Sequence, residues 1–591
     1  MEVTRTFDLL ERYATEFSNK PDALAAKVNR KWVNYSTNDY IEASNNVSYG
    51  LLALGLESGD KVATITNNRP EWNFVDMALS QTGMIHVPLF ATLTKEGYKQ
   101  IFEHAEVKAV FVSDAKLYEQ LKPITPALFF TFDAVADARN WSEVRDLGKD
   151  NAEQYIAHVT ATKTQIKATD PVTLIYTSGT TGNSKGVLLS HQNLMSNAIA
   201  AASVFQLKPD QRYLSILPIC HVGERMGSYQ TQYSGCSIYY AENLASIAND
   251  LKDVQPHGFG AVPRILEKVF DKIIAKGHKL TGVKKKLFFW ALDLGLRYKH
   301  DGENGWWYEF QLSIANKIIF SKWREAMGGN VVSIGIGGAA LQPRLERVFW
   351  AAGIKLLNMY GLTETSPIIS INRQQSPDLR LGSVGALIKD VEVKIAADGE
   401  ILCKGPNVMI GYYKDEKATS QAIDSEGWFH TGDIGVMDDG KFLRITDRKK
   451  ELFKLSNGKY VSPQSIENIF KESVYIDQLM VIGEGEKFTS ALITLNFDEM
   501  KSWCAQNGLP FNDLHKLVNM PEVSELLNGI VKGFNKSLSK DEQVKRFKIV
   551  PGEWTPVTGE LSPTLKLKRR VLVDKYTDLI NEIFNKDGAE I

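Results

Sequence analysis

The sequence predicts an α/β protein: a large N-terminal region of parallel α/β layers with a β-rich subdomain, followed by a small mobile α+β C-terminal domain. Apolar runs with β propensity alternate with amphipathic stretches early in the chain, which is typical of parallel sheets flanked by helices. Later runs are shorter and turns more frequent. A chain of 591 residues also exceeds what one hydrophobic core holds, so we expect two or three domains.

The N-terminal region contains the clearest strand and helix signals. We predict strands at residues 61–65, 85–88, 107–113, 258–262 and 331–335. Between the first two, Pro70 and Glu71 predict the start of a helix that runs to about Thr82. Proline suits the first turn of a helix, and an acidic residue there complements its positive end.

After about residue 382 the pattern changes to short strands and hairpin turns. Asp398-Gly399 and Asp439-Gly440 are turn signals, because such pairs adopt the positive φ angles of tight hairpins. We predict a β-rich subdomain over about 382–449. A stretch rich in leucine, phenylalanine and tryptophan predicts a helical insertion over about 272–328.

The remaining residues are numerous enough to fold by themselves as an α+β unit. We therefore divide the chain into a large domain, 1–449, and a small domain, 450–591. The charged run at 447–450 stands between two apolar runs and is the predicted hinge, although such runs are also common as plain solvated connectors.

Composition narrows the function. The formal net charge of −1 argues against a dedicated nucleic-acid binder, which carries a basic excess. The four cysteines are scattered without a CxxC pair, which suggests neither disulfides nor zinc and favours a reducing cytoplasm. The sequence has no signal-peptide core and no run of about 18 apolar residues. We expect a soluble protein, or one lying peripherally on the cytoplasmic membrane face.

A loop rich in glycine, serine and threonine occupies residues 176–187, which read YTSGTTGNSKGV. Small residues expose backbone N–H groups and lysine adds positive charge, so the loop suits phosphate. The candidate ligands are Thr177, Ser178, Gly179, Thr180, Thr181, Gly182 and Lys185. An apolar run follows instead of a helix, so the spacing is not that of a P-loop. We predict a hairpin that folds over ATP; a plain surface connection is the alternative.

Two further motifs follow apolar runs. Gly337, Gly338 and Ala339 stand at a predicted strand end, where open α/β sheets bind ligands; a tight-packing turn is equally compatible. Residues 358–365 read NMYGLTET and offer an aromatic ring, hydroxyls and a carboxylate, which suit adenine, phosphate and Mg²⁺. A helix cap with a buried tyrosine is the alternative for this octamer.

Two more motifs lie nearer the C-terminus. Residues 427–433 read GWFHTGD and place the carboxylate of Asp433 on a glycine turn. This carboxylate could accept hydrogen bonds from both hydroxyls of a ribose, or could simply stabilise the turn, as aspartate often does next to glycine. Residues 561–570 read LSPTLKLKRR, a cationic cluster whose alternative reading is a solvated helix face.

Together, in this order, the five segments resemble those of the adenylate-forming superfamily, which includes acyl-CoA synthetases, firefly luciferase and the adenylation domains of peptide synthetases. The resemblance covers nearly the whole chain. Ser184 stands where the family usually has proline, which loosens the loop without removing a phosphate ligand.

The resemblance implies a role for each motif. Thr177 and Glu364 would hold Mg²⁺, and Asp433 with Arg448 would hold the ribose. It further implies nucleotide contacts from Gly338, Ala339, Asn358, Tyr360, Gly361 and Thr363, with Tyr360 stacked on adenine; substrate contacts from His221, Gly337 and Gly458; a hinge at Lys450; and catalytic roles for Lys566, Thr177, Lys185 and Glu364.

These roles fit a reaction in two steps. A carboxylate that attacks the α-phosphate of ATP is repelled by it, so positive charge must offset the repulsion as pyrophosphate leaves. The resemblance implies that the small domain then rotates, withdraws Lys566 and presents residues 455–460 to CoA, whose thiol releases AMP. Transfer to a carrier-protein phosphopantetheine, a different carboxylic acid, and a nonenzymatic scaffold remain alternatives.

The acid is indicated by two segments. Residues 217–225, LPICHVGER, resemble the mouth of the acyl pocket in long-chain acyl-CoA synthetases, and the insertion resembles theirs. His221 borders the carboxylate or is a satisfied core histidine. The basic run 284–286, close to Trp290 in the sequence, allows two expectations. It contacts anionic lipid, or it belongs to a helix that packs on the large domain. No feature indicates an oligomeric state.

Overall fold

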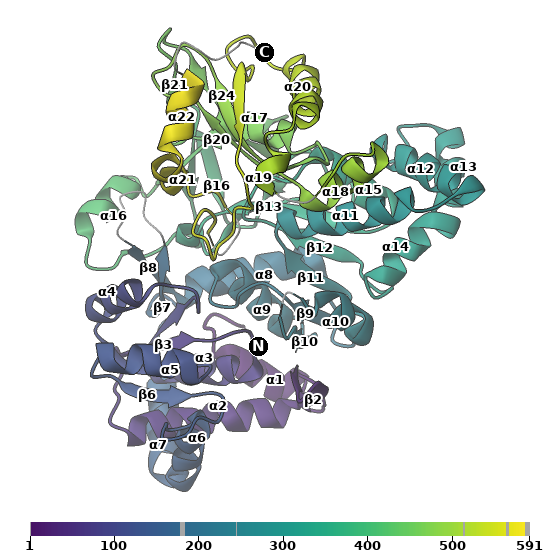
Figure 1. The fold of residues 1–591 in the computed structure, drawn as a ribbon. Helices are drawn as coiled ribbons and strands as arrows, with labels where there is room; N and C mark the ends of the chain where they lie inside the picture. Colours follow the sequence, from purple (N-terminus) through teal and green to yellow (C-terminus); the bar gives the residue numbers. More distant parts are fainter. Residues whose placement is uncertain (1, 178–183, 244, 512–513, 563–565, 585–591) are drawn as a thin grey trace.

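The computed structural model describes residues 2–177, 184–243, 245–511, 514–562 and 566–584. The large N-terminal region contains two sheets with helices around and between them, and the smaller C-terminal domain lies above it in Figure 1. The predicted α/β fold class is confirmed.

The larger sheet changes from parallel to antiparallel along its width. From β1 to β13 neighbouring strands are parallel, apart from the edge pair β1 and β2, and from β13 to β16 they are antiparallel. In spatial order its strands are β16 (Glu392–Ile395), β17 (Glu400–Lys404), β19 (Phe429–Asp438), β20 (Phe442–Arg448), β15 (Ala386–Leu387), β14 (Ile368–Ile371), β13 (Lys355–Gly361), β12 (Ser333–Ile336), β11 (Gly258–Ala261), β9 (Arg212–Ser215), β10 (Ser237–Tyr240), β1 (Leu24–Val28) and β2 (Lys31–Tyr35). The predicted β-rich stretch is therefore hydrogen-bonded into the large sheet.

The second sheet carries the start of the glycine-rich loop. Its order is β18 (Gly411–Tyr412), β8 (Lys185–Ser190), β7 (Pro171–Thr177), β4 (Ile85–Leu89), β3 (Lys61–Ile65), β5 (Val107–Val112) and β6 (Leu128–Thr131). β7 and β8 form an antiparallel pair in which Thr177 faces Lys185. The predicted hairpin strands are thus confirmed, while residues 178–183 between them lie outside the described part of the chain.

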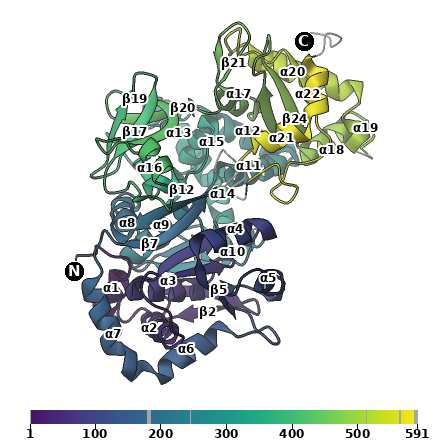
Figure 2. The same cartoon turned by 90° about the vertical axis from the view of Figure 1, so that its left-hand side faces the viewer.

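Helices cover and separate the two sheets. In the large region they are α1 (Asp8–Glu16), α2 (Thr37–Ala53), α3 (Pro70–Thr82), α4 (Lys95–Ala105), α5 (Ala115–Leu121), α6 (Trp141–Asp150), α7 (Ala152–Gln165), α8 (His191–Phe205), α9 (Val222–Tyr233), α10 (Ile247–Val254), α11 (Pro263–His278), α12 (Gly282–Leu296), α13 (Trp306–Ala315), α14 (Ser321–Ala326), α15 (Pro343–Ala351) and α16 (Glu416–Ala422). The largely buried helices α8 and α9 lie between the sheets in Figures 1 and 2, and their apolar side chains join the largest core. The insertion is helical, as predicted, and consists of α11 to α14 with the π-helix η2 (Asn316–Phe320).

The C-terminal domain has its own cores. Its elements are β21 (Phe453–Lys454), β22 (Tyr460–Val461), α17 (Pro463–Phe470), β23 (Ile476–Ile482), β24 (Ser490–Leu495), α18 (Phe497–Gln506), α19 (Leu514–Leu517), α20 (Pro521–Asn535), β25 (Arg546–Ile549), α21 (Arg569–Lys575) and α22 (Thr577–Phe584). Buried apolar side chains on the two faces of the sheet β23–β24–β25 form two clusters drawn from within this domain. We keep the division between 1–449 and 450–591 as a proposal, which these separate cores support.

The hinge region differs from the prediction in one respect. The Asp439-Gly440 turn has the expected positive φ angles, 52° and 66°, but β20 after it extends to Arg448. Asp447 and Arg448 are therefore strand residues paired with β19 and do not belong to a loose charged connector. Lys449 and Lys450 follow the strand directly.

Among the described residues, no helix combines the length and the apolar character that crossing a bilayer requires.

A buried ion network holds α9 against the second sheet. The Arg225 guanidinium lies 2.5 Å from Asp76 Oδ1 and donates to Thr173 Oγ1 at 2.6 Å, and the Tyr229 hydroxyl donates to Asp76 Oδ2 at 2.6 Å. Burial raises the pKa of Asp76, but Arg225 and His86 outweigh this effect and lower it. The carboxylate therefore stays charged and compensates the buried guanidinium.

We predict that Asp76→Ala lowers the free energy of unfolding by about 3–5 kcal/mol, because it leaves the buried Arg225 charge without a partner. Urea unfolding followed by circular dichroism measures the change. Asp253→Ala is the control, since its ion pair with Lys27 at 3.0 Å is half exposed and we expect a loss below about 1 kcal/mol. Equal losses in the two variants would contradict the role of the network.

Candidate functional site

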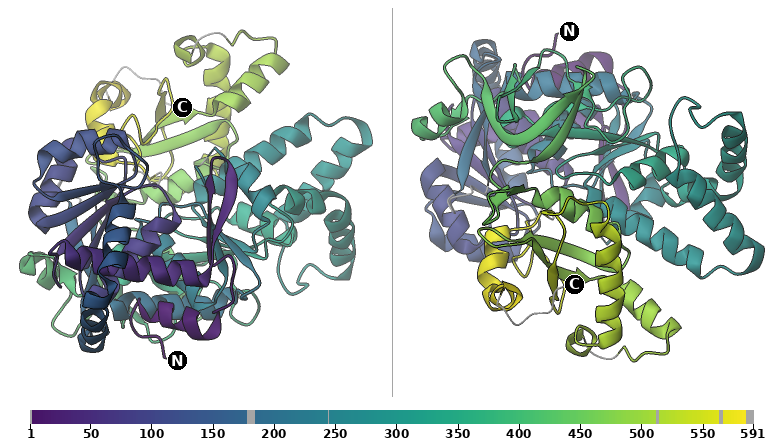
Figure 3. Two further views of the ribbon diagram at one scale, coloured as in Figure 1. Left: turned by 90° about the horizontal axis from the view of Figure 1, so that it is seen from below. Right: turned by 90° about the horizontal axis from the view of Figure 1, so that it is seen from above.

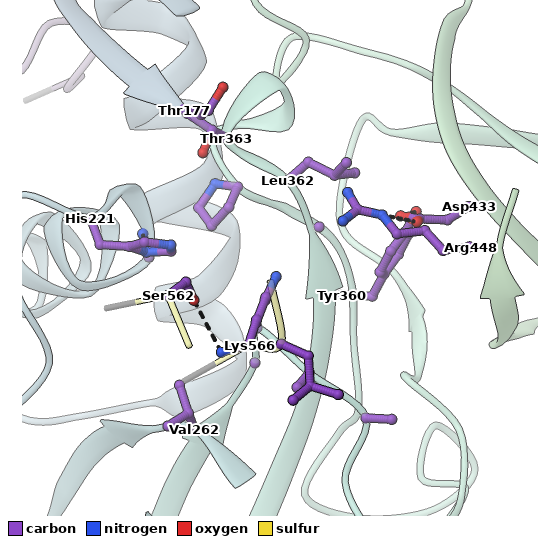
Figure 4. A pocket seen from close by; sticks show the side chains of 18 of the residues that line it. Thr177, His221, Val262, Tyr360, Leu362, Thr363, Asp433, Arg448, Ser562 and Lys566 are labelled. Atoms are coloured by element: carbon purple, nitrogen blue, oxygen red, sulfur yellow. Dashed lines mark hydrogen bonds and ion pairs between the residues drawn. The ribbon is translucent and has the colours of Figure 1, made fainter. Parts of the chain in front are cut away.

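A cavity of about 2900 Å³ lies between the large region and the C-terminal domain. Ends of β7, β12 and β13, the start of α9, the hairpin β19–β20 and the segment around Lys566 contribute to its walls. Figure 4 shows Lys566 between His221 on one side and Asp433 with Arg448 on the other. Residues of the large region and of the C-terminal domain thus line one cavity.

Most of the predicted site residues line this cavity. They are Thr177, Lys185, His221, Gly337, Gly338, Ala339, Asn358, Tyr360, Gly361, Thr363, Glu364, Asp433, Arg448, Lys450 and Lys566. Ser178, Gly179, Thr180, Thr181 and Gly182 lie outside the described residues. Gly458 is not brought to the cavity: it occupies an exposed turn between β21 and β22, with a φ of 84°.

Tyr360, Asp433 and Arg448 form one connected group. The Tyr360 hydroxyl donates to Asp433 Oδ2 at 2.7 Å, and Arg448 Nε lies 3.2 Å from Asp433 Oδ1. Asp433 and Arg448 face each other across β19 and β20, so sheet register sets their separation. Burial raises the pKa of Asp433, and the positive charge of Arg448 opposes that rise. This group can present a ring face and a carboxylate to a nucleoside.

Glu364 is held by a residue that the motif analysis did not select. The Tyr412 hydroxyl donates to Glu364 Oε1 at 2.9 Å, and Lys185 Nζ lies 4.6 Å from the centre of the Tyr412 ring. Met409 N–H donates to the Glu364 carbonyl at 2.8 Å. Tyr412 therefore connects the lysine of the glycine-rich hairpin with the carboxylate of the 358–365 motif.

Lys566 reaches the cavity from a turn at the base of α21. Its N–H donates to Ser562 Oγ at 3.0 Å, and its carbonyl accepts from Ser562 N–H at 2.8 Å. The ammonium is open to the cavity while protein surrounds it on several sides. This enclosure lowers the pKa of Lys566, and Arg448 lowers it further, whereas Asp433, Glu451 and Glu364 oppose the change.

Arg569 fastens the Lys566 segment to the C-terminal domain. Its guanidinium lies 2.7 Å from both carboxylate oxygens of Glu467 in α17 and 3.1 Å from Glu451 beside the hinge. The cationic cluster at 561–570 is therefore divided: Arg569 is paired in the interior, whereas Lys568 and Arg570 are exposed. The sequence alternative of a wholly solvated face is wrong for Arg569.

His221 caps the N-terminus of α9 at the cavity wall. Its Nδ1 accepts from the Gly223 N–H at 3.1 Å, so the neutral ring carries its proton on Nε2. Burial lowers the pKa of His221 to about 4, and the nearby charge of Lys566 contributes. At neutral pH this side chain is an uncharged hydrogen-bond donor beside the cavity.

Glycine is required where β13 meets the cavity. A Cβ at Gly361 would lie 1.7 Å from the Pro367 carbonyl oxygen, so any side chain there would displace the backbone. Gly338 has a φ of 85°, a left-handed conformation that glycine adopts without strain. At both positions the absence of a side chain leaves the backbone exposed at the cavity wall.

The hinge residues have different surroundings. Lys449 Nζ lies 2.6 Å from Asp398 and 2.8 Å from Glu400, whereas Lys450 is exposed and borders the cavity. Glu400 also accepts from the Gly432 N–H at 2.9 Å. The pairing of Lys449 anchors the last strand of the large region next to the point where the chain leaves it.

Three features of the site were not predicted from the sequence: the positions of Tyr412 and Glu400, and the pairing of Arg569 with Glu467 and Glu451. Each acts through a partner at least 30 positions away, and spacing along the chain carries no signal for such contacts.

Comparison with known proteins identifies the family. Residues 11–413 match the model of the AMP-binding enzyme family, and residues 450–588 match that of the AMP-binding enzyme C-terminal domain. Long-chain-fatty-acid–CoA ligase FadD15 of Mycobacterium bovis is 32% identical over 92% of each chain. Long chain acyl-CoA synthetase 6, peroxisomal, of Arabidopsis thaliana is 30% identical over 95% of this chain and 82% of that protein.

Solved structures agree on the fold. The A domain of carboxylic acid reductase from Segniliparus rugosus, in complex with AMP and a carboxylic acid, matches with a TM-score of 0.73 at 19% identity, covering 98% of this chain and 94% of that one. ATP-bound MatB from Rhodopseudomonas palustris matches with a TM-score of 0.71 at 20% identity, covering 98% and 100%. This chain belongs to the AMP-binding, adenylate-forming enzyme family.

Proposed function

We propose that this protein is an AMP-forming long-chain fatty acid–CoA ligase. The acid's carboxylate attacks the α-phosphate of ATP to give acyl-adenylate and pyrophosphate, and the CoA thiol then displaces AMP to give the thioester. The observation that carries the proposal is the meeting of Lys566 from the C-terminal domain with Glu364, Asp433 and Arg448 from the large region in one cavity. The names of the relatives support the substrate class.

The nucleotide is assigned to the group on β13 and the hairpin β19–β20. Tyr360 offers its ring to adenine next to Gly338 and Ala339. Asp433 accepts from the ribose hydroxyls, and its contact with Arg448 keeps it ionised against the effect of burial. Lys185 and Lys566 supply positive charge for the phosphates from opposite walls, which offsets the charge that develops as pyrophosphate leaves.

The carboxylate of Glu364 and the hydroxyl of Thr177 fit Mg²⁺. Both are oxygen donors, and the cation commonly binds through one or two carboxylates together with substrate phosphates. Among the described residues, no cluster of three or more His, Cys, Asp or Glu side chains could hold a metal ion. Bound at Glu364 and Thr177, the cation would neutralise phosphate charge, and Tyr412 would orient Glu364.

The acid is assigned to the part of the cavity below His221. Apolar residues of α9, β11 and α11 line it, including Met226, Phe259 and Ile265. The one buried acid there, Glu224, has its pKa raised by burial to about 8, so its carboxyl is protonated and uncharged at neutral pH. An alkyl chain suits these walls, and His221 Nε2 can donate to the acid's carboxylate.

The second step requires a different domain arrangement. Lys566 now fills the space beside His221, while Gly458 faces solvent away from the cavity. Rotation about Lys450 would withdraw Lys566 and bring the turn 455–460 to the acyl-adenylate, where CoA binds. The contacts to be broken are polar: Arg264 pairs with Asp477, and Arg344 donates to the Lys471 carbonyl at 3.4 Å.

Pyrophosphate release with ATP, Mg²⁺ and acids from acetate to oleate, each with and without CoA, tests the proposal. We expect CoA-dependent turnover that is strongest with long acids. Turnover restricted to short or aromatic acids would change the substrate class. Turnover that is independent of CoA but requires a phosphopantetheine-bearing carrier protein would favour the carrier-loading alternative. Absence of pyrophosphate release with every acid would contradict the ligase proposal and favour a protein that only binds nucleotide.

We predict that Lys566→Ala slows adenylation by about 100-fold or more, because the variant lacks the cation that meets the phosphates. Thioester formation from supplied acyl-adenylate should stay nearly unchanged. Stopped-flow pyrophosphate release and a CoA-consumption assay measure the two steps. Lys540→Ala, an exposed lysine of the same domain, is the control, and equal loss in both half-reactions would refute the rotation of Lys566 out of the site.

We predict that Glu364→Ala raises the Mg²⁺ concentration needed for half-maximal pyrophosphate release by about tenfold or more, since it removes a metal ligand. Tyr412→Phe should raise it less, because it removes only the hydroxyl that orients the carboxylate. Titration of Mg²⁺ at saturating ATP makes the measurement. Glu416→Ala, which removes an exposed acid four residues after Tyr412, is the control and should leave the Mg²⁺ requirement unchanged. An unchanged Mg²⁺ requirement in Glu364→Ala would show that Glu364 is not a metal ligand.

A further inference from the structure

Helices α12 and α13 and the π-helix η2 project from the large region. All views in Figure 3 and Figure 1 show these helices extending sideways beyond the body of the molecule. We call residues 282–320 the insertion wing. One face of the wing packs on the large region, because Phe288, Ala291 and Leu294 of α12 and Leu312 of α13 are buried in the main core.

The opposite face of the wing is apolar although it contacts solvent. The exposed fractions are 72% for Val283, 37% for Leu287, 80% for Trp306, 57% for Trp307, 52% for Phe310, 37% for Ile314 and 43% for Ile318. Trp306, Phe310, Ile314 and Ile318 recur at intervals of four, so they form one stripe along α13 and η2. Within the described chain, all tryptophan and phenylalanine side chains that are this strongly exposed lie here.

The pairing of the two helices brings α12 residues alongside this stripe. Trp290 Nε1 donates to Gln311 Oε1 at 3.4 Å, and the Tyr308 hydroxyl donates to the Leu294 carbonyl at 2.7 Å. The helices are therefore antiparallel, and the same register places Leu287 near Ile314. The exposed apolar residues thus form one patch across both helices.

Unpaired lysines border the patch. Lys284, Lys285 and Lys286 at the start of α12 and Lys317 in η2 are exposed, and none of them has an ion pair within the described structure. The helix register places Lys317 opposite Lys284. Two of the acids at the far end pair with basic neighbours, Asp293 with Arg297 and Glu303 with Lys299. The patch therefore carries a positive edge.

We propose that the insertion wing docks on the surface of an anionic lipid bilayer. Tryptophan and phenylalanine lie at the level of the lipid headgroups, and clustered lysines are attracted to anionic headgroups. A parallel two-fold contact with a second copy of this chain would bring the two lysine clusters together, and we treat a dimer as an outcome of the test. Docking goes beyond the proposed reaction: it would hold the protein where long-chain acids dissolve, and it is measurable without any substrate.

Flotation with vesicles tests the proposal on the full-length protein. The wild type should bind vesicles of phosphatidylcholine with phosphatidylglycerol and bind pure phosphatidylcholine much more weakly. Combined Lys284→Gln, Lys285→Gln and Lys286→Gln should weaken anionic binding by about 100-fold. Trp306→Ser with Trp307→Ser should weaken it by about tenfold or more, because less apolar area enters the interface.

Two controls separate docking from other effects. Lys532→Gln, Lys536→Gln and Lys540→Gln remove the same charge from exposed positions at the end of α20 and in the segment after it, and should leave vesicle binding unchanged. Thermal unfolding midpoints of all variants should match the wild type. The proposal is overturned by absence of wild-type binding, by binding that survives the tryptophan substitutions, or by a concentration-dependent dimer that these substitutions abolish.

Discussion

The pairing of Asp433 with Arg448 across β19 and β20 is the constraint on which the rest of the site depends. The two residues are register partners in one hairpin, and that hairpin ends where the chain passes to the C-terminal domain. The same strand therefore carries a charge that lines the cavity and leads directly to the predicted hinge. Because Lys449 is tied to Asp398 and Glu400, the proposed rotation of the C-terminal domain would begin at or after Lys450.

Outside the cavity, polar contacts join the C-terminal domain to the large region. Arg264 and Asp477 form the most direct pair, and Gln342 and Arg344 reach the Lys471 carbonyl. Polar contacts of this kind exchange readily with water, unlike a buried apolar interface. Arg569, in contrast, binds Glu467 inside the domain, so the segment that carries Lys566 would move with the domain in the proposed rotation.

Local signals allowed much of the fold to be predicted from the sequence. Pro70 before an amphipathic stretch marks the start of α3, and the Asp439-Gly440 turn marks the hairpin β19–β20, since both depend on backbone preferences of single residues. The continuity of the β-rich stretch with the large sheet was not predictable, because it depends on pairing between β15 in the stretch and β14 before it, and such pairing between strands leaves no local signal in the sequence. The contact of Tyr412 with Glu364 escaped prediction for the same reason.

The proposed acid-binding wall and the insertion wing illustrate a second limit. Composition identified the insertion as apolar, but it does not say which apolar residues are covered. In the wing, Phe288 and Leu312 are buried whereas Trp306 and Phe310 are exposed, although all four belong to the same helical pair. In the proposed acid pocket, the charge of Glu224 depends on burial that α9 acquires only when it packs between the sheets. Whether an apolar stretch forms core, pocket or docking surface is decided by its neighbours in the fold, and in this protein one insertion provides both core and surface.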